Sequence, residues 1–252
     1  MTMRKALLVS VSAVALGTAA AAPAHAAPPL PMTWTGFYVG ANAGYVWGSS
    51  NPWLSGNPNA SPYNQNALTG TPSLHPHGFI GGGQAGYDWQ NGQWVYGVVA
   101  DFSGISAKAD ASISPFFGFK GPNTVTWSSR YDWLFTARVR GGFLVAPTWL
   151  LYATGGLAVT EVHDSVTCTT TASGCGNFPG GWEFSKTSIL PGGAIGGGVE
   201  TIFAPNWSAQ LEYLYAKFGS TTPGSSAGLP PLFTFEHHLN LIRFAINYRF
   251  GP

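Results

Sequence analysis

The sequence predicts an all-β protein: an eight-stranded antiparallel up-and-down transmembrane β-barrel with four long extracellular loops and three short periplasmic turns. Only 8% of the residues are charged and 14% are aromatic, whereas about 25% of an ordinary soluble domain is charged. Apolar and polar residues alternate along many segments, as they do in strands. Long polar stretches and short turns separate these segments in strict alternation, which is typical of membrane barrels.

The N-terminus has the features of a secretory signal peptide. Arg4 and Lys5 precede an apolar, Ala-rich segment at 6–22, and Ala24-His25-Ala26 fits the small-x-small cleavage rule. We therefore expect a cleaved signal at 1–26 and one barrel domain at 27–252. The alternative is a membrane anchor, which this segment is too short and too Ala-rich to favour.

In the first half of the chain, each expected strand places apolar side chains on one face and small or polar ones on the other. Asn91-Gly92 joins two such segments, and this dipeptide is the strongest short hairpin signal. The expected strands are 34–48, 78–90, 93–107 and 127–144, with long loops at 49–77 and 108–126.

The second half repeats this pattern up to a final strand. The expected strands are 149–160, 189–203, 207–218 and 237–250, with short turns at 145–148 and 204–206 and long loops at 161–187 and 219–236. In the last strand, Ile242 and Phe244 lie on the face opposite Arg243. A soluble sandwich would turn that arginine to water, whereas a membrane barrel would turn it into the lumen.

The charged residues within the expected strands decide between these two architectures. The nine that are named below all fall on the less apolar face, and opposite charges enclosed in a narrow barrel can pair, which offsets the cost of burial. We expect Arg243 to pair with Glu212, or else with Glu200. The expected lumen network is Asp88, Asp101, Asp132, Arg138, Arg140, Glu200, Glu212, Arg243 and Arg249.

Cys168 and Cys175 are the only cysteines, and both lie in the third expected loop. After a signal peptide, such a pair predicts a disulfide. A zinc site would need about four ligands, and no further His or Cys pair stands nearby at a suitable spacing.

Several segments resemble the outer-membrane immunogenic, porin-like proteins of α-proteobacteria, within the OmpA-like barrel superfamily. They are WTGFYVGANAGY (34–45), VYGVVADFSG (95–104), LYATGGLA (151–158), GGGVETIFAPNWSAQLEYLYAKFG (196–219) and RFAINYRF (243–250). The resemblance implies an eight-stranded barrel that is exposed at the cell surface. It also implies that Phe250 is the terminal aromatic that the assembly machinery reads, although Gly251-Pro252 follow it here.

The sequence offers little chemistry for catalysis or metal binding. His163, Asp164 and Ser165 are adjacent, so they alternate between the faces of a strand and cannot form a relay. No G-x-S-x-G elbow occurs. His75, His77, His237 and His238 are expected to be solvated residues at the barrel rim, with a metal or haem site as the alternative. We therefore expect no enzyme and no cofactor; a lipid-modifying enzyme is a remote alternative.

These features favour a structural or interaction protein of the Gram-negative outer membrane, with an antigenic, adhesion-like or envelope-integrity role. The alternative is a narrow passive porin, although eight strands leave a lumen that side chains can fill. The expected partners are outer-membrane lipid and lipopolysaccharide, the barrel assembly machinery, periplasmic chaperones and a host or cell-surface partner of the loops. The nearly balanced charge argues against nucleic acid.

Overall fold

In a computed structural model, residues 33–54, 73–114, 123–170, 175, 180–222 and 233–250 are described. The expected signal at 1–26 lies outside them. The described residues contain no helix long and apolar enough to cross a membrane. Their regular structure is a set of strands: β1 (Gly36–Leu54), β2 (His77–Asn91), β3 (Trp94–Ile105), β4 (Lys108–Ile113), β5 (Asn123–Ala146), β6 (Trp149–Thr170), β7 (Trp182–Ala204), β8 (Trp207–Thr221) and β9 (Phe233–Arg249).

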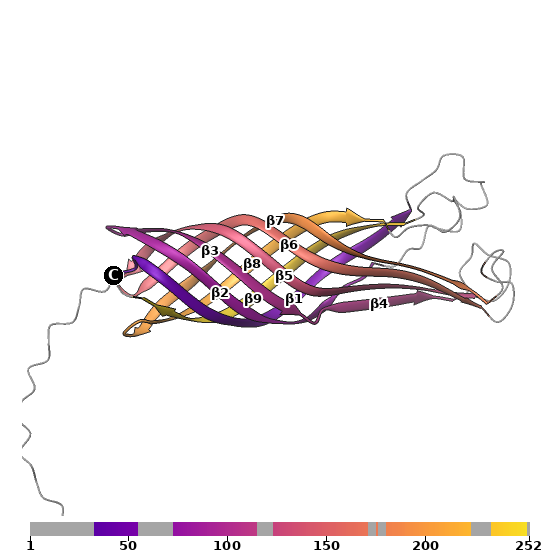
Figure 1. Ribbon diagram of the computed structural model, residues 1–252, viewed down its shortest axis with the longest axis horizontal. Helices are drawn as coiled ribbons and strands as arrows, with labels where there is room; N and C mark the ends of the chain where they lie inside the picture. The colour runs from indigo at the N-terminus through magenta and orange to yellow at the C-terminus, as the bar shows by residue number, and fades with distance from the viewer. Residues whose placement is uncertain are drawn as a thin grey trace, which may run out of the picture. The chain divides into compact units, whose positions relative to one another are not determined.

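The strands form one closed antiparallel barrel (Figure 1). Strand β1 pairs with β2 on one side and with β9 on the other, and this closes the sheet. Strands β3 and β4 pair in succession with β5, so together they occupy one position in the wall. The wall therefore has eight positions in an up-and-down order, which confirms the predicted fold class.

Three tight turns lie at the end of the barrel where the chain also ends (Figure 1). They join β2 to β3, β5 to β6 and β7 to β8, as predicted. Gly92 has a φ of 61° and Asn206 a φ of 66°, conformations that glycine and asparagine tolerate better than other residues. The Asn206 side-chain amide also donates to the Arg249 carbonyl at 2.7 Å. The β7–β8 turn therefore bonds directly to the last strand.

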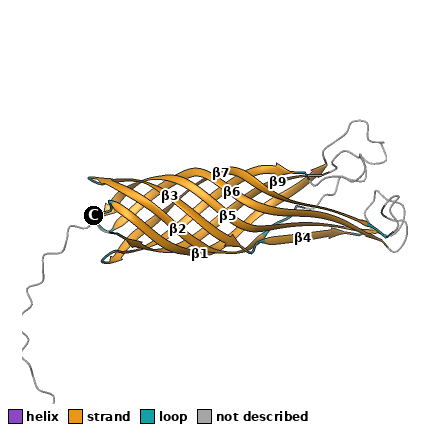
Figure 2. Cartoon of the chain, in the orientation of Figure 1, coloured by secondary structure: helices purple, strands orange, loops and turns teal. Residues whose placement is uncertain are grey.

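Two of the expected long loops are largely strand, which corrects the prediction. The segment 108–126 contains β4 and the start of β5, and the segment 161–187 contains the last part of β6 and the first part of β7 (Figure 2). Their outward positions carry Ser, Thr and charged residues rather than lipid-facing apolar residues, while inward positions such as Val125 and Val166 are buried. The alternation is therefore present, but its two faces do not look like those of a membrane-spanning strand.

A β-bulge in β5 explains why its alternation is hard to follow. Tyr131 pairs with Val162 and Trp133 with Glu161, so Asp132 is an extra residue with no partner of its own. Before the bulge, up to Tyr131, the odd-numbered residues of β5 point inward. After it, from Leu134 on, the even-numbered residues point inward. Tyr131 is therefore buried inside the barrel, although regular alternation from Trp133 predicts an outward position.

The outer wall has an apolar band between two aromatic rows. From Trp133 to Phe143, β5 covers roughly 33 Å, and strands tilted by about 35–45° give a band about 25 Å tall, the usual height in such barrels. The aromatic rows are Tyr45, Trp47, Phe79, Trp133 and Tyr213 on one side and Trp89, Trp94, Phe143, Trp207 and Tyr248 on the other.

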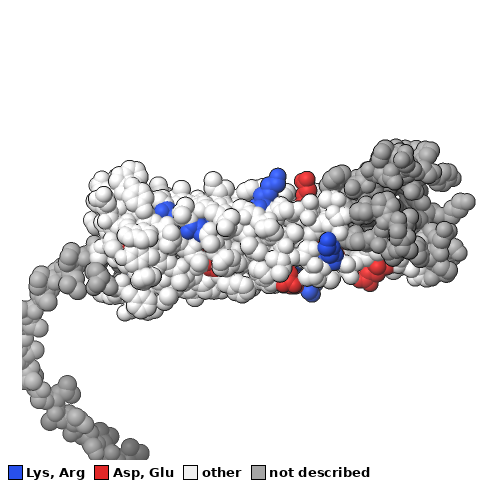
Figure 3. Space-filling view, turned by 45° about the horizontal axis from the view of Figure 1, so that its top comes forward, with Lys and Arg blue, Asp and Glu red and all other residues white. Residues whose placement is uncertain are grey.

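The exposed charged side chains lie beyond this band, and the larger blue and red patches of Figure 3 lie right of its middle. They sit on the long-loop ends of the strands, where the band has ended. They are Lys108, Asp110, Arg130, Asp132, Glu161, Glu183, Lys186, Lys217 and Glu236.

Beyond the band the wall separates into two outer sheets. The pairing of β7 with β8 begins at Gly192, so the preceding part of β7 pairs only with β6. On the other side, β1 continues past its last β2 partner, His77, while still paired with β9. We call these layers the β4–β7 outer sheet and the β1–β8–β9 outer sheet. An apolar cluster fills the space between them: Leu74, Val125, Trp127, Val166, Cys168, Cys175 and Phe235.

Candidate functional site in the barrel interior

Two rings of ion pairs fill the barrel between its aromatic rows. In the first, the mid-barrel ring, Arg138 contacts Asp101 and Glu212, each at 2.9 Å. Arg243 contacts the same two carboxylates, at 2.7 Å and 2.6 Å. The four side chains therefore alternate in sign around a closed ring, and each is at most 2% exposed.

The second, which we call the turn-side ring, has the same design. Arg140 contacts Asp88 and, at 2.8 Å, Glu200. Arg249 contacts the same carboxylates at 2.6 Å and 3.2 Å. A Cβ at Gly97 would overlap the Asp88 carboxylate, so the wall must carry glycine where this ring lies against it. Both rings are neutral, so no uncompensated charge is enclosed.

Uncharged polar side chains connect the two rings. The Gln210 amide donates to the Tyr152 hydroxyl at 2.7 Å, and that hydroxyl donates to Glu212 in the mid-barrel ring at 3.0 Å. The Asn247 amide donates to Glu200 in the turn-side ring at 3.2 Å. Gln84 donates to both Gln210 and Asn247. The rings therefore belong to one hydrogen-bonded network.

Apolar residues close this network at both ends. At the turn side, Trp34 is fully buried, donates from its indole N–H to the Pro147 carbonyl and places its ring 4.8 Å from the Arg249 guanidinium. At the other side a buried layer crosses the interior: Val46, Ile80, Ile105, Ala107, Tyr131, Leu134, Ala158, Val162, Leu190, Ala194, Leu214, Ala216, Phe218, Leu239 and Leu241. The rings are thus enclosed between packed layers.

The structure brings eight of the nine expected lumen residues into these rings. Asp132 is the exception: it follows the bulge, lies outside the barrel and pairs at 2.9 Å with Arg130, with side chains 37% and 57% exposed. Arg243 contacts its expected partner Glu212, while Glu200 pairs with Arg140 and Arg249 instead. Asp101, which reaches Arg243 through the interior, is a partner that strand adjacency could not identify.

A separate polar cluster lies between the outer sheets. The Nδ1 atom of His237 lies 2.8 Å from the Tyr131 hydroxyl, and its Nε2 atom lies 3.2 Å from the Asp164 carboxylate. Thr221 donates to Asp164, and Ser50 lies 3.4 Å from the imidazole. His237 is 1% exposed, so the expectation of a solvated rim histidine is wrong for this residue. Its inward register, in phase with Leu239 and Leu241, is the signal that would have placed it.

Cys168 and Cys175 form a disulfide with a Cα–Cα distance of 6.0 Å. Both cysteines are buried in the apolar cluster between the outer sheets. The described residues contain no group of three or more His, Cys, Asp or Glu side chains arranged as metal ligands.

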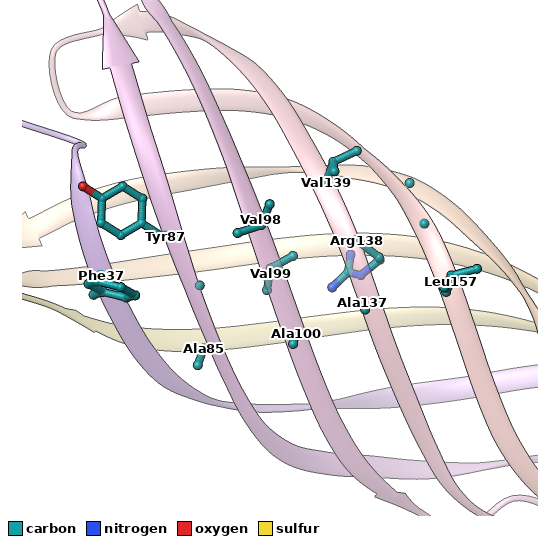
Figure 4. Close-up of a pocket in the computed structure, with 13 residues that line it drawn as sticks. Phe37, Ala85, Tyr87, Val98, Val99, Ala100, Ala137, Arg138, Val139 and Leu157 are labelled. Carbon is teal, nitrogen blue, oxygen red and sulfur yellow. The ribbon is translucent and has the colours of Figure 1, made fainter.

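The lipid-facing wall has a shallow groove over β2, β3, β5 and β6 (Figure 4). It has a volume of about 620 Å³. Ala85, Ala100 and Ala137 are direct cross-strand neighbours and form its floor. Larger side chains such as Phe37 and Leu157 project beside it, whereas the Arg138 guanidinium points to the interior. This groove can only meet hydrocarbon, so the polar chemistry of the band is confined to the lumen.

Comparison with known proteins agrees with this architecture. The model of the family described as "Outer membrane protein beta-barrel domain" matches residues 11–250. The 31 kDa outer-membrane immunogenic protein of Brucella melitensis is 32% identical over 228 residues, covering 86% of this chain and 88% of that protein. The 22 kDa outer membrane protein of Rhizobium leguminosarum is 27% identical over 230 residues, covering 90% and 83%.

Solved structures are more distant. The attachment invasion locus protein Ail of Yersinia pestis has a TM-score of 0.39 at 16% identity, with 86% of this chain and 99% of that chain covered. The protease OmpT from Escherichia coli has a TM-score of 0.47 at 10% identity, with 88% and 99% covered. The family match, the curated relatives and the closed barrel agree, and the chain belongs to the outer-membrane β-barrel protein family and is an outer-membrane protein.

Proposed function

We propose that this protein is a closed barrel with a structural and interaction role at the cell surface, and that it does not conduct solutes. The observation that carries the proposal is the filled interior. Eight ring side chains, each at most 7% exposed, occupy the lumen, and apolar layers close it at both ends. An eight-stranded barrel is just wide enough for side chains to fill it.

Conductance in a planar lipid bilayer tests this proposal. The purified protein should give no stepwise current, while a 16-stranded porin measured in the same bilayer supplies the positive control. Reproducible steps from the folded, heat-modifiable form would support the narrow porin instead. Conduction would require the rings to open. Opening is costly, because each buried charge would lose its ion-pair partner.

We also propose that the outer sheets are the surface that antibodies and host or cell-surface partners meet. The Brucella relative is named immunogenic, and the β4–β7 outer sheet presents rows of Ser and Thr hydroxyls beyond the lipid-facing band. Antibody raised against the folded protein should bind intact cells. Substituting lysine for both Ser128 and Ser165 should weaken that binding if this sheet carries the epitope. Lysine substitutions on the lipid-facing band are not a suitable control, because they would disturb insertion into the membrane.

The interior histidine does not favour an enzyme. Ser50, His237 and Asp164 form a chain that resembles a hydrolase relay. However, each is at most 1% exposed, and Tyr131 lies closer to the imidazole than Ser50 does. We infer that this set is structural. Ester or phospholipid hydrolysis that is lost in Ser50→Ala would contradict this inference.

Contacts with lipid and with the assembly machinery complete the proposal. Lys108, Arg130 and His163 form a cross-strand row just beyond the aromatic row on the long-loop side of the apolar band, where outer-leaflet phosphates would lie. Phe250, at the end of β9, donates its amide to the Phe37 carbonyl at 2.8 Å and is half exposed. Phe250→Ala should slow assembly in cells, whereas removal of Gly251-Pro252 should not. Mass spectrometry of the mature chain tests cleavage after Ala26, which we expect to accompany export to the periplasm.

A further inference from the structure

The buried cluster around His237 joins the two outer sheets. His237 and Thr221 belong to the β1–β8–β9 outer sheet, whereas Asp164 and Tyr131 belong to the β4–β7 outer sheet. Among the described residues, these sheets share no ladder of backbone hydrogen bonds at this level, because the pairing of β7 with β8 begins only at Gly192 and that of β1 with β2 ends at His77. The side-chain contacts of His237 therefore supply a buried polar link between them, in addition to the exposed contact of the Lys186 ammonium with the Thr222 carbonyl at 3.4 Å.

Asp164 differs from every other inward-facing carboxylate. The four carboxylates of the rings each contact two arginines. Asp164 is fully buried, has no arginine or lysine partner among the described residues, and leaves its Oδ1 atom without a hydrogen bond there. A buried carboxylate without a counter-charge is costly. The one group in contact that can become positive is His237.

The surroundings of His237 accept both its neutral and its protonated form. Thr221 gives its proton to Asp164, so the Nε2 atom of His237 must carry a proton to contact these oxygens. In the neutral imidazole, the Nδ1 atom accepts from the Tyr131 hydroxyl; after protonation it donates to the same oxygen. Only the hydroxyl proton has to turn. The titratable groups facing the imidazole are Asp164 from β6 and Tyr131 from β5, while β8 and β1 present the hydroxyls of Thr221 and Ser50.

We propose that His237 and Asp164 form a proton-operated latch that holds the two outer sheets together more tightly in mildly acidic surroundings. Proton uptake by His237 creates an ion pair with Asp164 and makes the enclosed cluster neutral. Proton loss leaves the Asp164 charge with hydrogen bonds alone. The contact between the sheets therefore strengthens as pH falls and weakens as pH rises.

Hydrogen exchange on the full-length protein folded in lipid vesicles tests the latch. Amide protection, corrected for the intrinsic effect of pH, is compared at about pH 5.5 and about pH 8, on either side of histidine titration. In the wild type, residues 160–166 and 233–239 should be severalfold better protected at the lower pH. Amides beside the rings, such as those of residues 209–213, serve as an internal reference that should not change.

Substitutions assign the effect to this pair. His237→Gln and Asp164→Asn should each abolish the pH dependence. The matched control is His238→Gln, because His238 is next in the chain but faces outward and contacts Ser49; it should keep the dependence. Equal wild-type protection at both pH values, or a dependence that survives His237→Gln, overturns the proposal. If His237→Gln fails to show the heat-modified mobility of a folded barrel, Asp164→Asn and the wild-type profile still decide.

Discussion

Arg243 and Glu212 face each other across β9 and β8, and their side chains meet at 2.6 Å inside the barrel. The neighbouring residues on β9, Ile242 and Phe244, point to the outside. One strand therefore shows the inverted order of a membrane barrel, with charge inside and apolar side chains outside.

The first prediction concerns this ion pair. Arg243→Ala leaves Glu212 and Asp101 with only Arg138, so it should lower the free energy of unfolding by about 3–5 kcal/mol. Arg130→Ala is the matched control, because it breaks the exposed pair with Asp132 and should cost at most about 1 kcal/mol. Reversible urea unfolding in lipid vesicles measures both. Equal costs for the two substitutions would mean that the ring is not enclosed.

The second prediction tests the lipid-facing assignment of Phe244. Phe244→Arg should cost about 2–4 kcal/mol, because it places a charge near the middle of the hydrocarbon. In membranes, Phe244→Cys should resist a water-soluble thiol reagent, whereas Asp110→Cys, on the exposed β4, should react. Rapid labelling at position 244 of the folded protein would reverse the assignment of the faces.

The third prediction concerns Trp34, which closes the turn-side end. Its indole is fully buried against Arg249. Trp34→Ala should therefore cost about 3–5 kcal/mol, as large core truncations do. Trp89→Ala, at an outward position of the same end, removes a side chain that is 51% exposed and should cost less. The same unfolding experiment compares the two variants. A smaller loss of unfolding free energy for Trp34→Ala than for Trp89→Ala would mean that Trp34 does not close the turn-side end of the barrel.

The fourth prediction concerns the disulfide. A disulfide that closes so short a loop lowers the entropy of the unfolded chain and should stabilise the folded state by about 2–3 kcal/mol. However, Cys168 and Cys175 lie between the outer sheets rather than in the membrane band. Cys175→Ser should therefore loosen the outer sheets to protease while the barrel keeps its heat-modified gel mobility. Two free thiols in the unreduced wild-type protein would contradict the bridge.

The sequence predicted the membrane band well, because period-two alternation there coincides with a strong contrast between lipid and lumen. Arg243, Glu212 and Arg138 could be placed from their strand phases alone. The Arg243–Glu212 contact also follows from strand adjacency, but the contact of Arg243 with Asp101 does not, since Asp101 meets Arg243 through the interior. Contacts through a lumen depend on barrel closure and stagger, which local patterns do not encode.

Outside the band the sequence was less informative. The outer parts of β5 and β6 carry Ser and Thr where lipid would require apolar side chains, so they were expected to be loops. Asp164 lies in an expected loop and is missed for the same reason. His237 is the first residue of an expected strand, where the strand phase alone does not separate a rim position from a buried one. Asp132 was misplaced because a single extra residue exchanges the two faces of a strand.

The last prediction tests that extra residue directly. Asp132 has no cross-strand partner of its own, and its neighbours already pair with Val162 and Glu161. Deleting Asp132 should leave a regular ladder in which Tyr131 still points inward and Trp133 outward. The loss is then mainly an exposed ion pair with Arg130, worth at most about 1 kcal/mol.

Deleting Thr136 supplies the contrast, because it removes a residue from a regular part of the same strand. That deletion shifts one side of β5 by one position and turns inward residues outward, which would separate Arg138 and Arg140 from their rings or displace the outer part of the strand. The variant lacking Asp132 should fold in vesicles with a near-wild-type urea midpoint, and the variant lacking Thr136 should not fold. If loss of Asp132 is as damaging as loss of Thr136, then the bulge is not what sets the phase of β5.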